Sequence, residues 1–245
     1  MKKGATHVDI LPIISKVGFT LAEVLITLGI IGVVAAMTIP SLYNSMQKRV
    51  TVSKLQKTYS ELANASKLAM DESGGLLLTG EGTARERFEK YFMPHLKGTP
   101  TRLERNTLIY YTTAGTRETG LNLLRSNSTE YVLPSGVSLL TDDNENPYVH
   151  HAWITGLSIL IDINGYNNPP NRFGRDAFIM VLYSDGNISL TYSDDGEAGT
   201  VNRPREVLKD GPSSYNYQCN KKGRGMWCGA LIQKDGWRIS PDYPW

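Results

Sequence analysis

The chain is 245 residues long, enough for one or two globular domains. Its 26 basic and 24 acidic residues give a formal net charge of +2; residues 1–18 hold three of the lysines and one aspartate, so 23 basic and 23 acidic residues follow them. This balance argues against a strongly nucleic-acid-binding surface, and we expect no nucleic-acid partner.

The amino-terminal segment combines a basic leader with a long apolar run. The run covers residues 19–39 and contains one charged residue, Glu23. At 1.5 Å per residue it makes a helix of about 31 Å, close to the thickness of a bilayer's hydrocarbon core. The lysines of the leader favour a cytoplasmic amino end. We therefore predict a leader over 1–18, a membrane span over 19–39 and an outer domain over 40–245.

Glu23 is the unusual residue of this span. A charge inside a bilayer-length segment costs about 2.5–3.5 kcal/mol on insertion scales, so an ionisable residue there is interpreted as functional. The partner that we expect for Glu23 is the amino terminus of a neighbouring subunit. The alternative is a plain signal anchor in which Glu23 lies near the lipid headgroups.

The residues around the span resemble the amino-terminal segment of type IV prepilins and type II secretion pseudopilins. Gly18 and Phe19 lie where prepilins are cut, Glu23 is fifth after the cut, and Pro40 is twenty-second. An ordinary secretory signal has its cleavage site after the apolar core, whereas this candidate cut precedes it.

This resemblance implies that a prepilin peptidase cuts after Gly18 and that the new amino group of Phe19 is N-methylated. It further implies an inner-membrane assembly platform, other pilin or pseudopilin subunits as partners, and a path from the bacterial inner membrane and its lipid into a periplasmic or cell-surface filament. An amino group buried in lipid needs an anion, which Glu23 of an adjacent subunit can supply. The alternative function is a membrane-anchored or filament-tip adhesin that binds a ligand.

A helical rhythm continues beyond the span. Residues at spacings of three and four form an apolar face up to Ala69, and Ser73-Gly74-Gly75 supplies a helix stop. We predict one helix from about Thr20 to Ser73, with its second half packed on a sheet as in pilins. A second helix is predicted over 83–96, where Thr83 and Glu86 are spaced as a capping box.

Short β-like segments follow the helices. A long helix followed by a meander of strands predicts an α+β fold, with the helix on an antiparallel sheet, rather than alternating βαβ units. The polar stretch 196–217 is predicted to be irregular. The predicted strands are 108–113, 131–140 with an interruption at 134–136, 157–163, 177–183 and 188–192.

Cys219 and Cys228 lie nine positions apart, on the side of the membrane where disulfides persist. We predict that they pair; such a ring resembles the small disulfide loop near the carboxyl end of many pilins. Two free thiols or half of a metal site are the alternatives.

Oxygen-bearing residues between two predicted strands raise the possibility of a calcium site. Asp162, Asn164 and Asp176 are candidate ligands, although their spacing does not match an EF-hand. The alternative is that these residues shape turns through local hydrogen bonds, with the aspartates pairing with Arg172 or Arg175. We expect no other cofactor.

The remaining polar segments show no sequence pattern that indicates a catalytic or binding site. The acidic stretches 142–146 and 194–197 are interpreted as solvated turns, and His150 and His151 as surface histidines. No nucleophile elbow, zinc-protease helix or phosphate-binding loop is present, so we predict that the protein is not an enzyme.

Aromatic residues crowd the carboxyl-terminal part of the chain. We expect Trp227 and Trp237 to pack the disulfide loop onto the sheet, and residues 243–245 to supply a contact surface.

Overall fold

We describe the protein from a computed structural model, in residues 18–75, 82–96, 101–105, 108–119, 128–142, 148–150, 154–190, 203–213 and 215–245. The chain divides into two compact units, residues 1–45 and 46–245. Helix α1, Leu21–Glu72, contributes to both, and its bounds confirm the predicted helix to within one residue at each end.

The two halves of α1 differ in burial. Large apolar side chains up to Val50 are exposed, whereas the second half buries one face against the sheet. The helix ends where Gly74 takes a positive φ of 63° and Gly75 donates its N–H to the carbonyl of Met70, at 2.9 Å. This is the left-handed stop that the glycine pair predicts. The buried residues of α1 are Thr51, Val52, Leu55, Thr58, Leu62, Ala65, Ser66 and Ala69.

The predicted helix over 83–96 is helical but changes its winding. It consists of α2 (Ala84–Arg87), a π-helical turn η1 (Phe88–Phe92) and a 3-10 turn η2 (Met93–His95). The capping box is confirmed, because the Thr83 N–H donates to Glu86 Oε2 at 2.8 Å and the Glu86 N–H donates to Thr83 Oγ1 at 3.1 Å. Phe88 and Phe92 stack with ring centroids 4.6 Å apart in the core.

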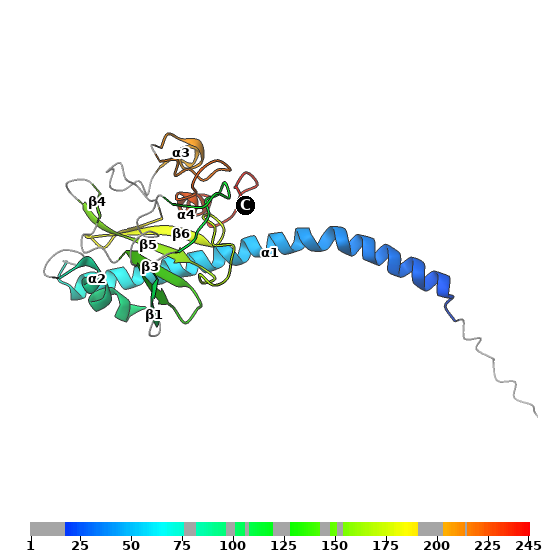
Figure 1. Ribbon diagram of the computed structural model, residues 1–245, viewed down its shortest axis with the longest axis horizontal. Coiled ribbons are helices and arrows are strands. Elements are labelled where there is room, and N and C mark those ends of the chain that lie inside the picture. The colour runs from blue at the N-terminus through cyan, green and yellow to red at the C-terminus, as the bar shows by residue number, and fades with distance from the viewer. Residues whose placement is uncertain are drawn as a thin grey trace, which may run out of the picture. The chain divides into compact units, whose positions relative to one another are not determined.

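Seven strands form one antiparallel sheet in the order β1-β2-β3-β5-β6-β7, with β4 paired to β5 beside β3. This confirms the α+β class with the long helix on an antiparallel sheet (Figure 1). The strands are β1 (Thr101–Arg105), β2 (Ser128–Val132), β3 (Ser138–Asp142), β4 (Tyr148–His150), β5 (Ile154–Asp162), β6 (Ala177–Tyr183) and β7 (Ile188–Ser189).

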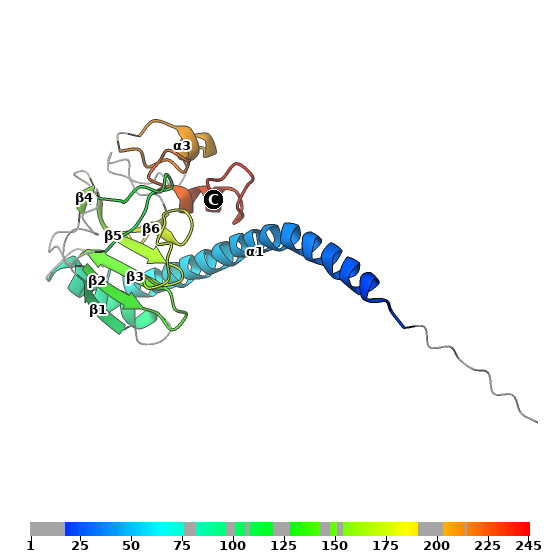
Figure 2. The same cartoon turned by 45° about the vertical axis from the view of Figure 1, so that its right-hand side comes forward.

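Strand β6 lies at the centre of the core. All seven of its side chains are buried, so both faces of the sheet are covered at this strand. Helix α4 (Cys228–Lys234) contacts β6, and in Figures 1 and 2 the cyan half of α1 runs along the opposite face. The Ser66 hydroxyl donates to the carbonyl of Gly186, and Lys54 Nζ donates to that of Ile163. Polar contacts therefore fix α1 on the sheet alongside its apolar face.

Three sequence predictions were wrong. Residues 108–113 are not a strand: Tyr111 makes only isolated bridges, and the chain reverses where the Thr112 N–H donates to the carbonyl of Thr116. Within the polar stretch 196–217 lies α3 (Arg205–Asp210), which had been predicted as irregular. The strand predicted over 188–192 is present at Ile188–Ser189 as β7 but does not include Leu190, and residues 191 and 192 lie outside the described residues. The elements β1, β4 and α4 were not predicted.

The core packing of α1 gives a direct stability test. Leu62 is fully buried and Leu68, on the same helix, is 50% exposed. We expect Leu62→Ala to lower the free energy of unfolding by about 2–5 kcal/mol, because it leaves a cavity, and Leu68→Ala to change it by about 0.5 kcal/mol or less. Urea unfolding of the detergent-solubilised chain measures both. Equal losses in the two variants would contradict the packed face described here.

Candidate functional site

The first described residues begin helix α1 with a capping box. The backbone N–H and the hydroxyl of Thr20 both donate to Glu23 Oε2 at 2.8 Å, and the Glu23 N–H donates to Thr20 Oγ1 at 3.2 Å. Gly18 and Phe19 precede the helix, and Phe19 is 88% exposed. The Glu23 carboxylate thus accepts hydrogen bonds from donors at the start of the helix. We did not predict this role, although the sequence Thr-x-x-Glu before an apolar run is typical of a capping box.

The half of α1 that follows is apolar and exposed. By length and composition α1 is the one helix among the described residues that could cross a membrane, and its most apolar stretch has no buried residue. A core helix of a soluble protein would be mostly buried, whereas a signal sequence near the amino terminus would have the same length and composition. A Cβ added at Gly29 or Gly32 would meet no atom within 4 Å, so both glycines leave open, flat surfaces.

The predicted disulfide is present. Cys219 and Cys228 are bonded, with their Cα atoms 4.8 Å apart, and both are fully buried. The Cys219 N–H donates to the carbonyl of Leu208 in α3, and Cys228 begins α4, so the ring joins the two short helices. These elements are part of the carboxyl-terminal segment that contacts β6.

An ion pair anchors this ring to the rest of the domain. Arg224, inside the ring, donates to both carboxylate oxygens of Glu118 at 2.6 and 2.7 Å. The Glu118 side chain is only 2% exposed, so the pair is buried on its acidic side. Removing one partner would leave a buried charge, which is costly.

The three candidate calcium ligands come together in one turn region. Asp162 ends β5, Asp176 precedes β6, and the Asn164 N–H donates to Asp162 Oδ1 at 3.2 Å. The other Asp162 oxygen accepts from the Tyr110 hydroxyl at 2.9 Å. Asp176 accepts the backbone N–H of Arg172 at 2.5 Å. Both carboxylates therefore shape turns through hydrogen bonds, as the alternative interpretation holds.

The side chain of Arg172 lies elsewhere: its guanidinium donates to the carbonyls of Thr112 and Thr113. Across the described residues, no group of three or more His, Cys, Asp or Glu side chains is placed to hold a metal ion. Residues 143–146, 194–197 and His151 lie outside the described part of the chain. His150 lies in β4.

Burial raises the pKa values of Asp162 and Asp176. It raises the pKa of Asp162 to about 7, and the charge of Asp176 adds to the rise, against hydrogen bonds from Tyr110 and Asn164 that lower it. Burial also raises the pKa of Asp176. A carboxyl whose folded pKa lies above its unfolded value of about 3.9 stabilises the fold in its protonated form. That contribution is complete below about pH 4 and is lost as the pH rises through 7.

We expect Asp162→Asn to flatten the pH dependence of the unfolding free energy between pH 4 and 7 by a few kcal/mol. The amide oxygen can still accept the Asn164 N–H, and the amide nitrogen can donate to the Tyr110 oxygen, but the side chain no longer titrates. Chemical denaturation at a series of pH values measures the effect. The exposed Asp185→Asn is the control, and matching profiles for Asp162→Asn and the unchanged chain would refute the assignment.

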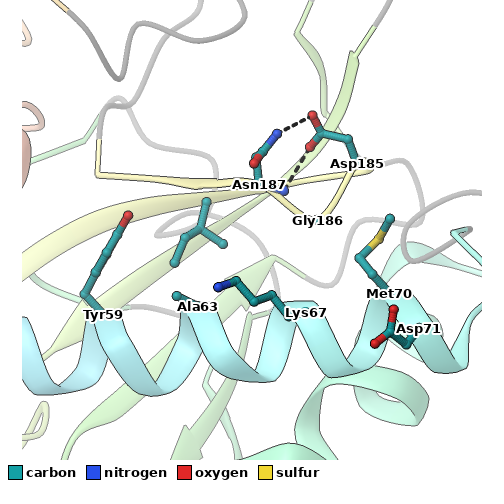
Figure 3. A pocket seen from close by; sticks show the side chains of 9 residues that line it. Tyr59, Ala63, Lys67, Met70, Asp71, Asp185, Gly186 and Asn187 are labelled. Atoms are coloured by element: carbon teal, nitrogen blue, oxygen red, sulfur yellow. Dashed lines mark hydrogen bonds between the residues drawn. The ribbon is translucent and has the colours of Figure 1, made fainter.

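A groove lies between α1 and the turn that joins β6 to β7 (Figure 3). Its volume is about 480 Å³, within the range of small-molecule sites. Asp185 accepts two hydrogen bonds from Asn187 at its rim, and in Figure 3 the Lys67 side chain lies along the helix side of the groove, with its nitrogen toward Ala63. Its walls are Tyr59, Ala63, Lys67, Met70, Asp71, Asp185, Gly186, Asn187 and Ile188.

The carboxyl-terminal aromatic residues divide between core and surface. Trp227 is buried beside Tyr217, in agreement with its predicted packing role, whereas Trp237 is partly buried and its ring centroid lies 5.5 Å from that of Tyr59, which belongs to α1 and not to the sheet. Tyr243, predicted to lie on a contact surface, is buried instead, and its hydroxyl donates to the carbonyl of Gly174 at 2.5 Å. Trp245 is partly exposed.

Comparison with known proteins gives one family match. Residues 200–245 match a family of unknown function (DUF6613). The chain matches no curated protein and no solved structure. The matched segment is the one that holds α3, the disulfide ring and α4, and the span lies outside it.

Proposed function

We propose that the chain is a structural subunit, a pilin or pseudopilin, that a prepilin peptidase cuts after Gly18 and that assembles into a type IV pilus or type II secretion pseudopilus. The observation that carries the proposal is the division of α1 between an exposed apolar half and a half buried on the sheet. An exposed apolar surface of this size needs lipid or like helices to cover it.

The position of Glu23 supports this function. It lies in the exposed apolar half, four residues after Phe19, whose amino group a cut after Gly18 would free and N-methylation would retain as a cation. Within lipid, that amino group and the Glu23 carboxylate of an adjacent subunit would neutralise each other and fix the axial register. Thr20 holds the carboxylate at the same end of the helix, at 2.8 Å.

The small residues of the span support close packing between subunits. Gly29 and Gly32 offer flat surfaces on which helices approach each other, as packing in lipid favours. A head-to-tail contact that does not close on itself generates a helical filament. The proposed partners are therefore the peptidase, the inner-membrane assembly platform, membrane lipid and further subunits.

The proposal includes no catalytic role and no cofactor. Calcium bound by Asp162, Asn164 and Asp176 is not part of it, because the carboxylates of both aspartates already accept hydrogen bonds from the protein.

The proposed function predicts how the amino terminus is cleaved and methylated. When the full chain is expressed with a prepilin peptidase, we expect its amino terminus to be Phe19 with one additional methyl group, as measured by mass spectrometry. Gly18→Val should abolish the cut, since a branched side chain replaces the small residue at the cleavage point. Gly29→Ala adds its methyl group in open space and should leave the cut intact. An intact Met1 terminus beside an active peptidase would contradict the proposal.

The proposed function also predicts that filament assembly depends on the charge of Glu23. Glu23→Gln keeps an oxygen that can accept the Thr20 N–H but removes the charge, so it separates helix capping from neutralisation. We expect normal cleavage and a drop of at least about tenfold in sheared filaments seen by electron microscopy, because about 1.4 kcal/mol per contact already gives tenfold. Glu61→Gln, on the buried half of α1 and paired with Lys57, is the control. Filaments at the normal level from Glu23→Gln would refute this role.

A ligand-binding, membrane-anchored protein is the second candidate, and the groove beside β7 favours it. The two functions differ in processing. The anchored protein retains Met1 and forms no filaments, and its groove then becomes the surface for ligand screening.

A further inference from the structure

The groove between α1 and the turn from β6 to β7 has walls that the fold holds in place. The Ser66 hydroxyl donates to the carbonyl of Gly186 at 2.5 Å, so the turn is fastened to the helix. Gly186 has a positive φ of 80°, and a Cβ added there would lie 2.3 Å from Met70 Cγ. Helix and turn are thus in direct contact beside the groove, whose shape is formed before a ligand enters, as is usual for small-molecule sites.

One end of the groove is aromatic. Tyr59 lines it there, and in Figure 3 Met70 lies toward the other end. The Tyr59 side chain is only partly buried, and the ring of Trp237 supports it, with ring centroids 5.5 Å apart and 52° between the ring planes. The groove therefore has an accessible aromatic ring whose position is fixed by a second ring.

The supporting residue Trp237 has a strained backbone. It follows α4, its N–H donates to the carbonyl of Ile232 at 2.9 Å, and its φ is +56°. A bulky side chain is rare at a positive φ, and residues strained in this way gather at ligand sites. Here the strained conformation accompanies the contact between the Trp237 ring and Tyr59, at the end of the groove.

Polar side chains of both charges line the rest of the groove. They are Lys67, Asp71, Asp185 and Asn187. Each oxygen of the Asp185 carboxylate accepts one hydrogen bond from Asn187 and keeps a further acceptor position. Within the described residues, the Lys67 ammonium and the Asp71 carboxylate make no hydrogen bond or ion pair. The groove therefore offers hydrogen-bond donors and acceptors together, with one positive and two negative charges.

This combination of groups selects the chemical class of the ligand. A phosphate or sulfate would meet the like charges of Asp71 and Asp185, which disfavours an anion. A fully apolar ligand would cover polar side chains without giving them partners. A sugar avoids both costs, because each hydroxyl can donate and accept, and the C–H groups on one face of the sugar ring can pack on the electron-rich face of an aromatic ring such as Tyr59.

We propose that this groove binds a neutral carbohydrate. The C–H face of one sugar ring packs on Tyr59, and the sugar hydroxyls form hydrogen bonds with Lys67, Asp71 and Asp185. Every residue that lines the groove belongs to the unit of residues 46–245. The inference goes beyond the proposed filament and applies equally to an anchored protein, because it uses no residue of the apolar run 19–39.

The test is saturation-transfer difference NMR on the full chain, in a detergent whose headgroup is not a sugar. The probes are the methyl glycosides of glucose, galactose and N-acetylglucosamine. We expect saturation transfer to at least one of them, and a drop of at least fivefold in Tyr59→Leu, which removes the ring but keeps an apolar side chain. Tyr215→Leu, at a tyrosine that is 55% exposed outside the groove, is the matched control and should leave the transfer unchanged.

A second pair of variants keeps the test decisive if Tyr59→Leu does not fold. Ala63→Phe fills the groove and should abolish the transfer, whereas Asn64→Phe adds the same ring at the next, exposed position of α1 and should not. No transfer to any of the three glycosides, or transfer that Ala63→Phe leaves unchanged, overturns the proposal. Transfer to the zwitterionic dipeptide glycyl-leucine in place of the glycosides also overturns it. These failures leave the cleavage and filament predictions standing, since those are measured at Phe19 and Glu23.

Discussion

The structure depends on a helix that meets two different environments along its length. The second half of α1 buries an apolar face that includes Leu55 and Leu62, both fully buried in the core of the domain. The first half has apolar side chains on all sides and no protein cover among the described residues. The two halves of one helix therefore differ in what they require, since the second half is covered by the sheet and the first half needs a cover from outside the described residues.

Much of this fold could be predicted from the sequence, because long elements repeat their signal. Helix α1 combines a period of three and four with a glycine stop, and β6 is an apolar run between turn residues, so both were predicted closely. Short elements such as α3, with six residues, are too brief to show a period. Residues 108–113 have strand composition, but the reversal at Thr112 uses their backbone groups for a turn.

The site was predicted in part, for a similar reason. The pairing of Cys219 with Cys228 was predicted from two cysteines in a domain that was expected to lie outside the cytoplasm, and the structure contains that disulfide. The hydrogen bonds of Asp162 could only be described as alternatives, because its partner Tyr110 is 52 residues away. The Thr20–Glu23 capping box was overlooked because the carboxylate was interpreted only as a charge in lipid. Local capping and neutralisation by a neighbour are compatible, since a carboxylate has several acceptor positions.

The strands at the ends of the sheet affect how readily copies of this protein would pair strand to strand at high local concentration. A subunit concentrated beside identical copies risks joining them strand to strand through unpaired backbone groups. Along the main strand order of the described residues, the sheet ends at β7, which has two residues, and at β1, whose sequence includes Arg102, Glu104 and Arg105; β4, with three residues, is a further edge. The strands at these two ends are therefore poor templates for amyloid-like growth.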